Sequence, residues 1–190
     1  SLAKLKAGNA RFVASPQDAL PVDAGKRAAL AKGQTPFATL LSCADSRVPP
    51  EIVFHTGLGD LFVVRAAGNV TDKAILASIE YSVEHLNVPL VVVMGHESCG
   101  AVKAAVDTPV GQSLGPNLDY LVAQIRPSVT ATASKPESER MRAAILAKRK
   151  HEGAIRTAPT RTNPGNLAHQ DRLGDAIDDG VATLDQPISR

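Results

Sequence analysis

Two short segments of the chain carry residues that could bind a metal ion. Cys43, Asp45 and Arg47 alternate in one segment, and His96 and Cys99 lie three residues apart in the other. Each segment follows an apolar run that is typical of a buried strand. In an open parallel sheet, ligands bind outside the carboxyl ends of the strands. Two such ends could therefore bring both cysteines and the histidine to one point.

Two cysteines and a histidine form a known catalytic zinc set, which leaves a fourth position for water. Thiolates and a neutral imidazole suit a borderline-soft ion. Cys99 is also expected near the start of a helix, whose free N–H groups favour a thiolate. The spacing alone leaves two alternatives open, because buried and chemically inert cysteines are common in protein cores.

The elements that must position these residues alternate between helices and strands. Thr71 is expected to cap the helix whose apolar face begins at Ile75, and Pro49-Pro50 to stop regular structure after the first metal-binding segment. A break or kink is expected at Pro127. The predicted strands cover 37–43, 61–66 and 90–95; the predicted helices cover 2–13, 26–32, 72–86, 98–106, 118–129 and 137–150.

The inner strands are continuous runs rich in Val and Leu, as parallel strands covered on both faces should be. We predict an α/β fold with three layers, in which helices flank a mostly parallel central β-sheet with three clear strands and a fourth that is poorly placed. Residues 1–150 are predicted to form this domain, with an N-terminal helical arm. Residues 151–190 contain Pro159, Pro164 and Gly165 with little apolar periodicity, and are predicted to be an irregular tail.

Composition narrows the class of protein. The chain has 190 residues, 44% of them hydrophobic, and a formal net charge of +2. This balance argues against a nucleic-acid partner, and no apolar run approaches the roughly 20 residues that a membrane span needs. The two cysteines show no disulfide-like pattern. The expected location is cytoplasmic, or periplasmic if a signal upstream of Ser1 was removed.

Several motifs occur together in a fixed order, and they resemble β-class carbonic anhydrases. The match runs from about residue 2 to 106 and fades toward residue 150. The motifs are Ser-Cys-Ala-Asp-Ser-Arg-Val-Pro-Pro-Glu (42–51), Gly-Asp-Leu-Phe-Val-Val-Arg (59–65), Ala-Gly-Asn (67–69), Ser-Ile-Glu-Tyr (78–81) and Gly-His-Glu-Ser-Cys-Gly-Ala-Val (95–102).

The resemblance implies a zinc lyase, a carbonic anhydrase that reversibly hydrates CO2 to bicarbonate and a proton through a zinc-bound hydroxide. It implies one Zn²⁺ per chain, held by Cys43, His96 and Cys99, and self-association as a dimer or a tetramer of dimers. It also implies that the N-terminal helix packs on a partner subunit. The C-terminal hairpin of the family has no counterpart in this sequence, so the last strand could be missing.

The resemblance assigns catalytic roles to Asp45 and Arg47. Paired with Arg47, Asp45 stays off the metal and accepts a hydrogen bond from the hydroxide; unpaired, it could become the fourth zinc ligand in a closed form. The simpler interpretation is a surface ion pair.

The resemblance also implies a plant-type substrate pocket, part of it donated across a dimer. Its matching residues are Gln34, Phe62, Ala67, Tyr81 and Gly100. Phe62 would be equally well explained as strand core, and Tyr81 as part of a helix face.

Three other functions remain open at this point. The same fold could act on another small substrate, such as carbon disulfide. The chain could be an inactive zinc-binding remnant, because its C-terminal segment departs from the family. Cys43 or Cys99 could also form a metal-free nucleophile with His96.

Overall fold

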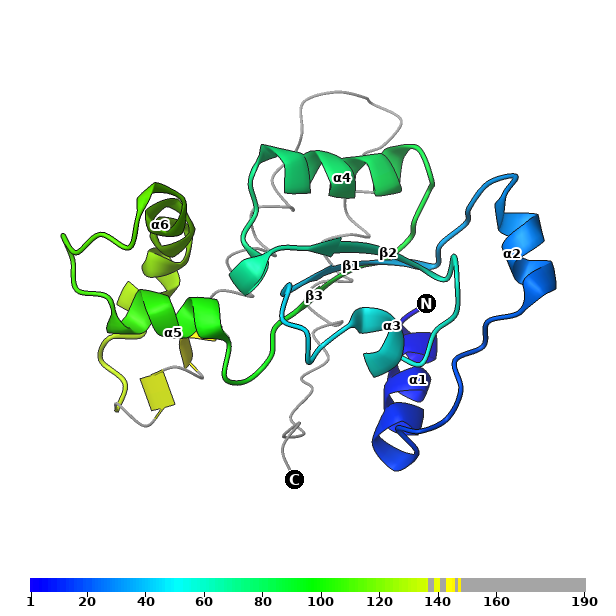
Figure 1. Ribbon diagram of the computed structural model, residues 1–190, viewed down its shortest axis with the longest axis horizontal. Helices are drawn as coiled ribbons and strands as arrows, with labels where there is room; N and C mark the ends of the chain where they lie inside the picture. Colours follow the sequence, from blue (N-terminus) through cyan, green and yellow to red (C-terminus); the bar gives the residue numbers. More distant parts are fainter. Residues whose placement is uncertain (137–138, 141–142, 146, 148–190) are drawn as a thin grey trace.

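The computed structural model describes residues 1–136, 139–140, 143–145 and 147 (Figure 1). Three strands form its sheet: β1 (Ala38–Ser42), β2 (Leu61–Arg65) and β3 (Val91–Met94). The helices are α1 (Leu2–Ala14), α2 (Ala24–Leu30), α3 (Pro50–Val53), α4 (Lys73–Glu84), α5 (Gly100–Asp107), α6 (Pro116–Thr130) and the 3-10 helix η1 (Ala67–Asn69).

The sheet is parallel, with strand order β2-β1-β3. Every residue of the central strand β1 is buried, as expected for a parallel strand that is covered on both faces. Ser42 at the end of β1 pairs with Arg65 on one side and with Met94 on the other. The segments that begin at Cys43 and at Gly95 therefore leave the sheet next to each other.

Helices cover both faces of this sheet, so the predicted three-layer arrangement is confirmed (Figure 1). Helix α4 packs Ile75, Ile79 and Val83 on one face, against Leu41 and Val64 among others. The helices α1 and α3 cover the other face, where Leu5, Val53 and Phe54 join the core formed by Leu40 and Val92. Helices α5 and α6 pack on each other beyond the carboxyl ends of the strands (Figure 1).

The N-terminal helix α1 packs on its own chain. Leu5 is only 1% exposed, and the side-chain amide of Asn9 donates a hydrogen bond to the Val53 carbonyl at 3.1 Å. Gly8 allows this close approach, since a Cβ there would lie 1.8 Å from the carbonyl oxygen of Phe54. The apolar face of α1 is thus used within the chain, and a contact with a partner would need another face.

Two local predictions were wrong, and a third, a break or kink at Pro127, was wrong as to the break. Asp72, rather than Thr71, caps α4 by accepting a hydrogen bond from the backbone N–H of Ile75 at 2.9 Å. Pro50 begins α3 instead of ending regular structure, because the first position of a helix has no N–H bond to lose. Helix α6 continues through Pro127 to Thr130, since its face with Val122 and Ile125 is buried beside α5.

Two predictions concern residues that are largely outside the described part of the chain. Of the predicted helix 137–150, residues 139–140, 143–145 and 147 are helical. The predicted irregular tail, 151–190, lies wholly outside the described residues. In the described ranges, no helix combines the length and the apolarity that crossing a bilayer requires.

Candidate metal centre

The structure brings the three predicted ligand side chains together. The Sγ atoms of Cys43 and Cys99 lie 3.9 Å apart, and these atoms and a ring nitrogen of His96 all fall within 4.8 Å of one another. All three side chains are buried, with exposed fractions of 4% for Cys43, 8% for His96 and 2% for Cys99. Parallel pairing of β1 with β3 produces this meeting point, because both strands end on the same side of the sheet.

The backbone after β2 supports the sulfur of Cys43. The N–H of Gly68, in η1, donates a hydrogen bond to Cys43 Sγ at 3.3 Å. Gly68 has a φ of +61°, and a Cβ at this position would lie 2.7 Å from Cδ1 of Ile125. Both the backbone conformation and the close packing require glycine here.

Cys99 occupies the N-cap position of α5, which agrees with its predicted place near the start of a helix. Its hydrogen bond with Cys43, and then its burial, raise the pKa of the Cys99 thiol, while backbone N–H groups of α5 oppose this shift. The same thiol hydrogen bond is the main cause that lowers the pKa of Cys43 to about 4. Together these opposite shifts favour a thiolate at Cys43 that accepts the hydrogen bond of the Cys99 thiol.

The buried ring of His96 tests whether a metal ion fits this site. Neither Nδ1 nor Nε2 of His96 has a hydrogen-bond partner among the described residues, although both atoms are buried. Buried polar atoms without a partner are costly, and a bound ion is one of the features that would satisfy them. A neutral imidazole and two cysteine sulfurs at this separation fit Zn²⁺, which accepts N and S ligands in a tetrahedral arrangement.

Asp45 and Arg47 form a two-pronged ion pair beside the cluster. Arg47 Nε donates to Asp45 Oδ1 and Arg47 Nη2 to Asp45 Oδ2, each at 2.8 Å. These hydrogen bonds hold the pKa of Asp45 well below its usual range. Oδ2 of Asp45 lies 3.9 Å from Nε2 of His96, so the carboxylate faces the cluster.

The same guanidinium links the two metal-binding segments. Nη2 of Arg47 also donates a hydrogen bond to the carbonyl oxygen of Ser98 at 3.0 Å. Ser98 precedes Cys99 and has a φ of +54°, an uncommon backbone conformation for a residue other than glycine.

Sequence reasoning assigned no role to Arg65 or to Gly68. Arg65 donates from Nε to the Cys43 carbonyl at 2.8 Å and from Nη2 to the Asp45 carbonyl at 2.7 Å. Both residues lie in motifs that the sequence contains, and Arg65 is a charged residue that ends the strand β2. However, Arg65 contacts backbone carbonyls and Gly68 contacts a sulfur atom, and neither kind of contact produces a periodic pattern in the sequence.

The five predicted pocket residues fall into two groups. Ala67 and Gly100 lie beside the cluster, as chain neighbours of Gly68 and Cys99. Phe62 instead pairs with Thr39 near the beginning of β1, and its ring is 6.1 Å from that of Tyr81 on α4. Tyr81 is 47% exposed, and Gln34 is exposed in a separate hollow of about 650 Å³ with Leu58 and Gly59. The chain does not bring Gln34, Phe62 or Tyr81 to its own cluster.

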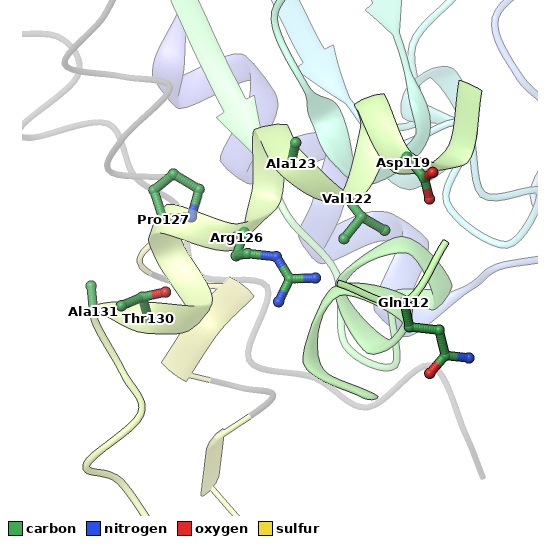
Figure 2. A pocket seen from close by; sticks show the side chains of 8 residues that line it. All are labelled: Gln112, Asp119, Val122, Ala123, Arg126, Pro127, Thr130 and Ala131. Atoms are coloured by element: carbon green, nitrogen blue, oxygen red, sulfur yellow. The ribbon is translucent and has the colours of Figure 1, made fainter. Parts of the chain in front are cut away.

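Another hollow, of about 640 Å³, lies along α6 (Figure 2). It contains none of the cluster residues. Figure 2 shows Arg126 beside this hollow, and Nη2 of Arg126 donates a hydrogen bond to the carbonyl of Thr108 at 3.2 Å. The hollow is lined by Gln112, Asp119, Val122, Ala123, Arg126, Pro127, Thr130 and Ala131.

Comparisons with known proteins agree with this geometry. The sequence model of the family described as Carbonic anhydrase matches residues 38–183, which extends into the segment that we predicted to be an irregular tail. The chain is 52% identical over 126 residues to Carbonic anhydrase 2 of Mycobacterium tuberculosis, covering 66% of this chain and 61% of that protein. It is 56% identical over 102 residues to a carbonic anhydrase of Mycolicibacterium smegmatis, covering 54% and 50%.

A solved structure shares the fold over most of the chain. It belongs to tetrameric β-carbonic anhydrases of Sordaria macrospora and has a TM-score of 0.64 at 25% identity, covering 93% of this chain and 85% of the other. The matches to the two bacterial relatives span only 61% and 50% of those proteins' lengths.

Proposed function

Since the chain belongs to the β-carbonic anhydrase family, we propose that it catalyses the reversible hydration of CO2 to bicarbonate and a proton. We further propose that Cys43, His96 and Cys99 hold one zinc ion. The observation that carries this proposal is the buried cluster itself, with three ligand atoms within 4.8 Å and two unpartnered nitrogens on the imidazole. A bound zinc ion would act as a Lewis acid and lower the pKa of the water bound to it, as is known for carbonic anhydrases.

Asp45 is proposed to orient the attacking water. Because Arg47 keeps its pKa low, Asp45 is a carboxylate at neutral pH and can only accept hydrogen bonds. Because both carboxylate oxygens accept hydrogen bonds from Arg47, Asp45 would be less available as a fourth metal ligand. The role of Arg47 is to fix this arrangement rather than to contact substrate.

Gly100 is proposed to receive a substrate oxygen. Its backbone N–H lies in the first turn of α5, where the helix leaves donors without intrahelical partners. A Cβ added at Gly100 would meet no atom within 4 Å, so there is room beside this backbone. Ala67, on the η1 side of the cluster, would contribute a small apolar wall.

A second copy of the chain is proposed to complete the pocket. Gln34, Phe62 and Tyr81 match pocket positions of the family but do not reach the cluster of their own chain. The Sordaria proteins are described as tetrameric, and a symmetric dimer could present these residues to the neighbouring site. The hypothesis predicts that a monomeric form has low activity even when it is loaded with zinc.

The deciding experiment measures CO2 hydration by stopped flow and zinc content in the same purified sample. We expect about one zinc per chain and measurable hydration, both lost in Cys43→Ser. Zinc without hydration would contradict the proposed activity and would favour another small substrate or an inactive remnant. Hydration without zinc would overturn the assignment of the metal.

A further inference from the structure

Arg65 ends β2 with its guanidinium turned toward the backbone that follows β1. Its Nε and Nη2 donate to the carbonyl oxygens of Cys43 and Asp45, at 2.8 Å and 2.7 Å. These two residues are a predicted metal ligand and the carboxylate beside it. Arg65 thus touches the main chain of both without contacting either side chain through these bonds.

This segment follows β1, at the edge where backbone pairing between β1 and β2 stops. Backbone pairing between β1 and the end of β2 continues only as far as the bonds from Ala66 N to Ser42 O and from Ala44 N to Ala66 O, each 3.2 Å. Along the chain, the carbonyl of Cys43 lies between these two bonds and takes part in neither. The carbonyl of Asp45 accepts one further bond, from Val48 N at 3.2 Å. The planar guanidinium fork of Arg65 reaches both carbonyls and gives each of them a hydrogen bond from outside the segment.

Fixing two carbonyl oxygens on one side directs the side chains of residues 43–45. From this backbone, Cys43 Sγ reaches the N–H of Gly68 and the sulfur of Cys99. The carboxylate of Asp45 reaches Arg47, which in turn reaches the carbonyl of Ser98. Loss of the two Arg65 bonds would free the backbone that carries both the ligand sulfur and the carboxylate.

We propose that Arg65 is a positioning residue that sets the geometry of the metal site through the backbone of residues 43–45. The inference rests on the proposed zinc site but not on the reaction that the site performs. It predicts that losing the fork weakens zinc binding and distorts the coordination, whereas losing an equivalent arginine elsewhere does neither.

The test compares Arg65→Met with Arg65→Lys in the full chain. Zinc affinity is measured by competition with a chromophoric chelator, and coordination geometry by the visible absorption of the cobalt-substituted protein. Loss of partners that orient metal ligands typically reduces metal affinity about 10–100-fold, and we expect this range for Arg65→Met. Arg65→Lys keeps the charge but replaces the fixed fork by a compact ammonium, so we expect only partial recovery.

Arg126→Met is the matched control. Arg126 is also a half-buried arginine that donates to a backbone carbonyl, but it lies on α6 beside the hollow of Figure 2. We expect its zinc affinity and cobalt spectrum to equal those of the unmodified chain, whatever happens to its thermal stability.

The outcomes test the positioning role of Arg65 separately from the proposed hydration of CO2. Unchanged zinc affinity and an unchanged cobalt spectrum in Arg65→Met would overturn the positioning role. If Arg65→Met does not fold, Arg65→Lys decides, because full affinity in that variant would show that the fork is unnecessary. A zinc-loaded chain that does not hydrate CO2 would overturn the proposed activity and leave the affinity comparison valid. A chain that binds no zinc would overturn both.

Discussion

Arg47 donates two side-chain hydrogen bonds of 2.8 Å to the carboxylate of Asp45, and its backbone N–H donates a third of 3.0 Å. The pair is partly open to solvent, because 52% of the Arg47 side chain is exposed against 18% of Asp45. An exposed ion pair by itself contributes little to stability. Its position beside His96 and its added bond to Ser98 therefore point to a role in arranging the site.

Arg47→Ala tests that role. We expect the variant to bind zinc, since the three ligands remain, but to lose about 100-fold or more in CO2 hydration, because Asp45 is no longer held in place. Stopped-flow hydration and zinc content are measured on the same sample. The control is Arg11→Ala on α1, which removes an exposed ion pair with Asp18 and should keep full activity. Near-normal hydration by Arg47→Ala would contradict the proposed role.

The meeting of Cys43, His96 and Cys99 could be predicted because apolar strands precede both segments and parallel strands end on one side of a sheet. The roles of Arg65 and Gly68 in this site could not be predicted from the sequence. Arg65 acts on carbonyl oxygens, which every residue carries, so no partner residue marks its role in the sequence. Glycine is required at position 68 because φ is positive there and because a Cβ would collide with Ile125, a residue that is distant in the chain.

The errors at helix boundaries have a similar origin. A proline can begin a helix or break one, and the sequence around Pro50 and Pro127 does not show which of these each proline does. Packing decides between these outcomes, since the buried face of α6 continues on both sides of Pro127 at Ile125 and Ser128. Likewise, Thr71 and Asp72 are both good caps, and only the backbone geometry selects Asp72.

Gly68→Ala should damage both the fold and the metal site. Alanine at a φ of +61° is strained, and its Cβ would meet Ile125 at 2.7 Å and Ala101 at 3.1 Å. We expect a loss of about 1–3 kcal/mol in the free energy of unfolding, together with weaker zinc binding, because the N–H donor to Cys43 moves. Urea unfolding and chelator competition measure the two effects. Gly25→Ala in α2, where the nearest atom is a carboxylate oxygen of Asp23, is the control.

Removing zinc should change the reactivity of both cysteines. In the loaded protein we expect Cys43 and Cys99 to resist a thiol reagent, because their sulfurs are metal ligands and are buried. A strong chelator should make them reactive, and mass spectrometry of the labelled peptides identifies the sites. Equal labelling before and after chelation would contradict a metal-bound pair. It would instead favour a metal-free cysteine nucleophile.

Leu5→Ala tests the packing of α1 on its own chain. Truncating a side chain that is 1% exposed in the core beside Leu40 and Phe54 should cost about 2–5 kcal/mol of unfolding free energy. Val13→Ala on the same helix removes a side chain that is 51% exposed and should have little effect. Unfolding free energies are compared with size-exclusion profiles. A change in oligomer size without a loss of protomer stability would place this face of α1 on a partner instead.

Asp119→Asn should destabilise the protein in a pH-dependent way. The Asp119 carboxylate, in the first turn of α6, accepts hydrogen bonds from Ser113 Oγ at 2.6 Å and from the N–H of Leu114 at 2.7 Å, and these bonds lower its pKa from the ordinary value of 3.8. A pKa that is lower in the folded state means that the ionised form stabilises the fold. This stabilisation is present above the ordinary value and is lost as pH falls through the lower, folded value.

The measurement for Asp119 compares urea midpoints of metal-free protein at about pH 7 and at about pH 2.5, which lies below the ordinary pKa of an aspartate carboxyl group. The deficit of Asp119→Asn relative to the unmodified chain should shrink at the lower pH. Ser113→Ala removes the hydroxyl partner, so it should raise the pKa of Asp119 toward 3.8 in an NMR titration and reproduce part of the deficit. In the double variant the two losses should not add, because both report the same hydrogen bond. A deficit that is equal at both pH values would show that an uncharged amide fails for steric reasons and that ionisation of Asp119 does not stabilise α6.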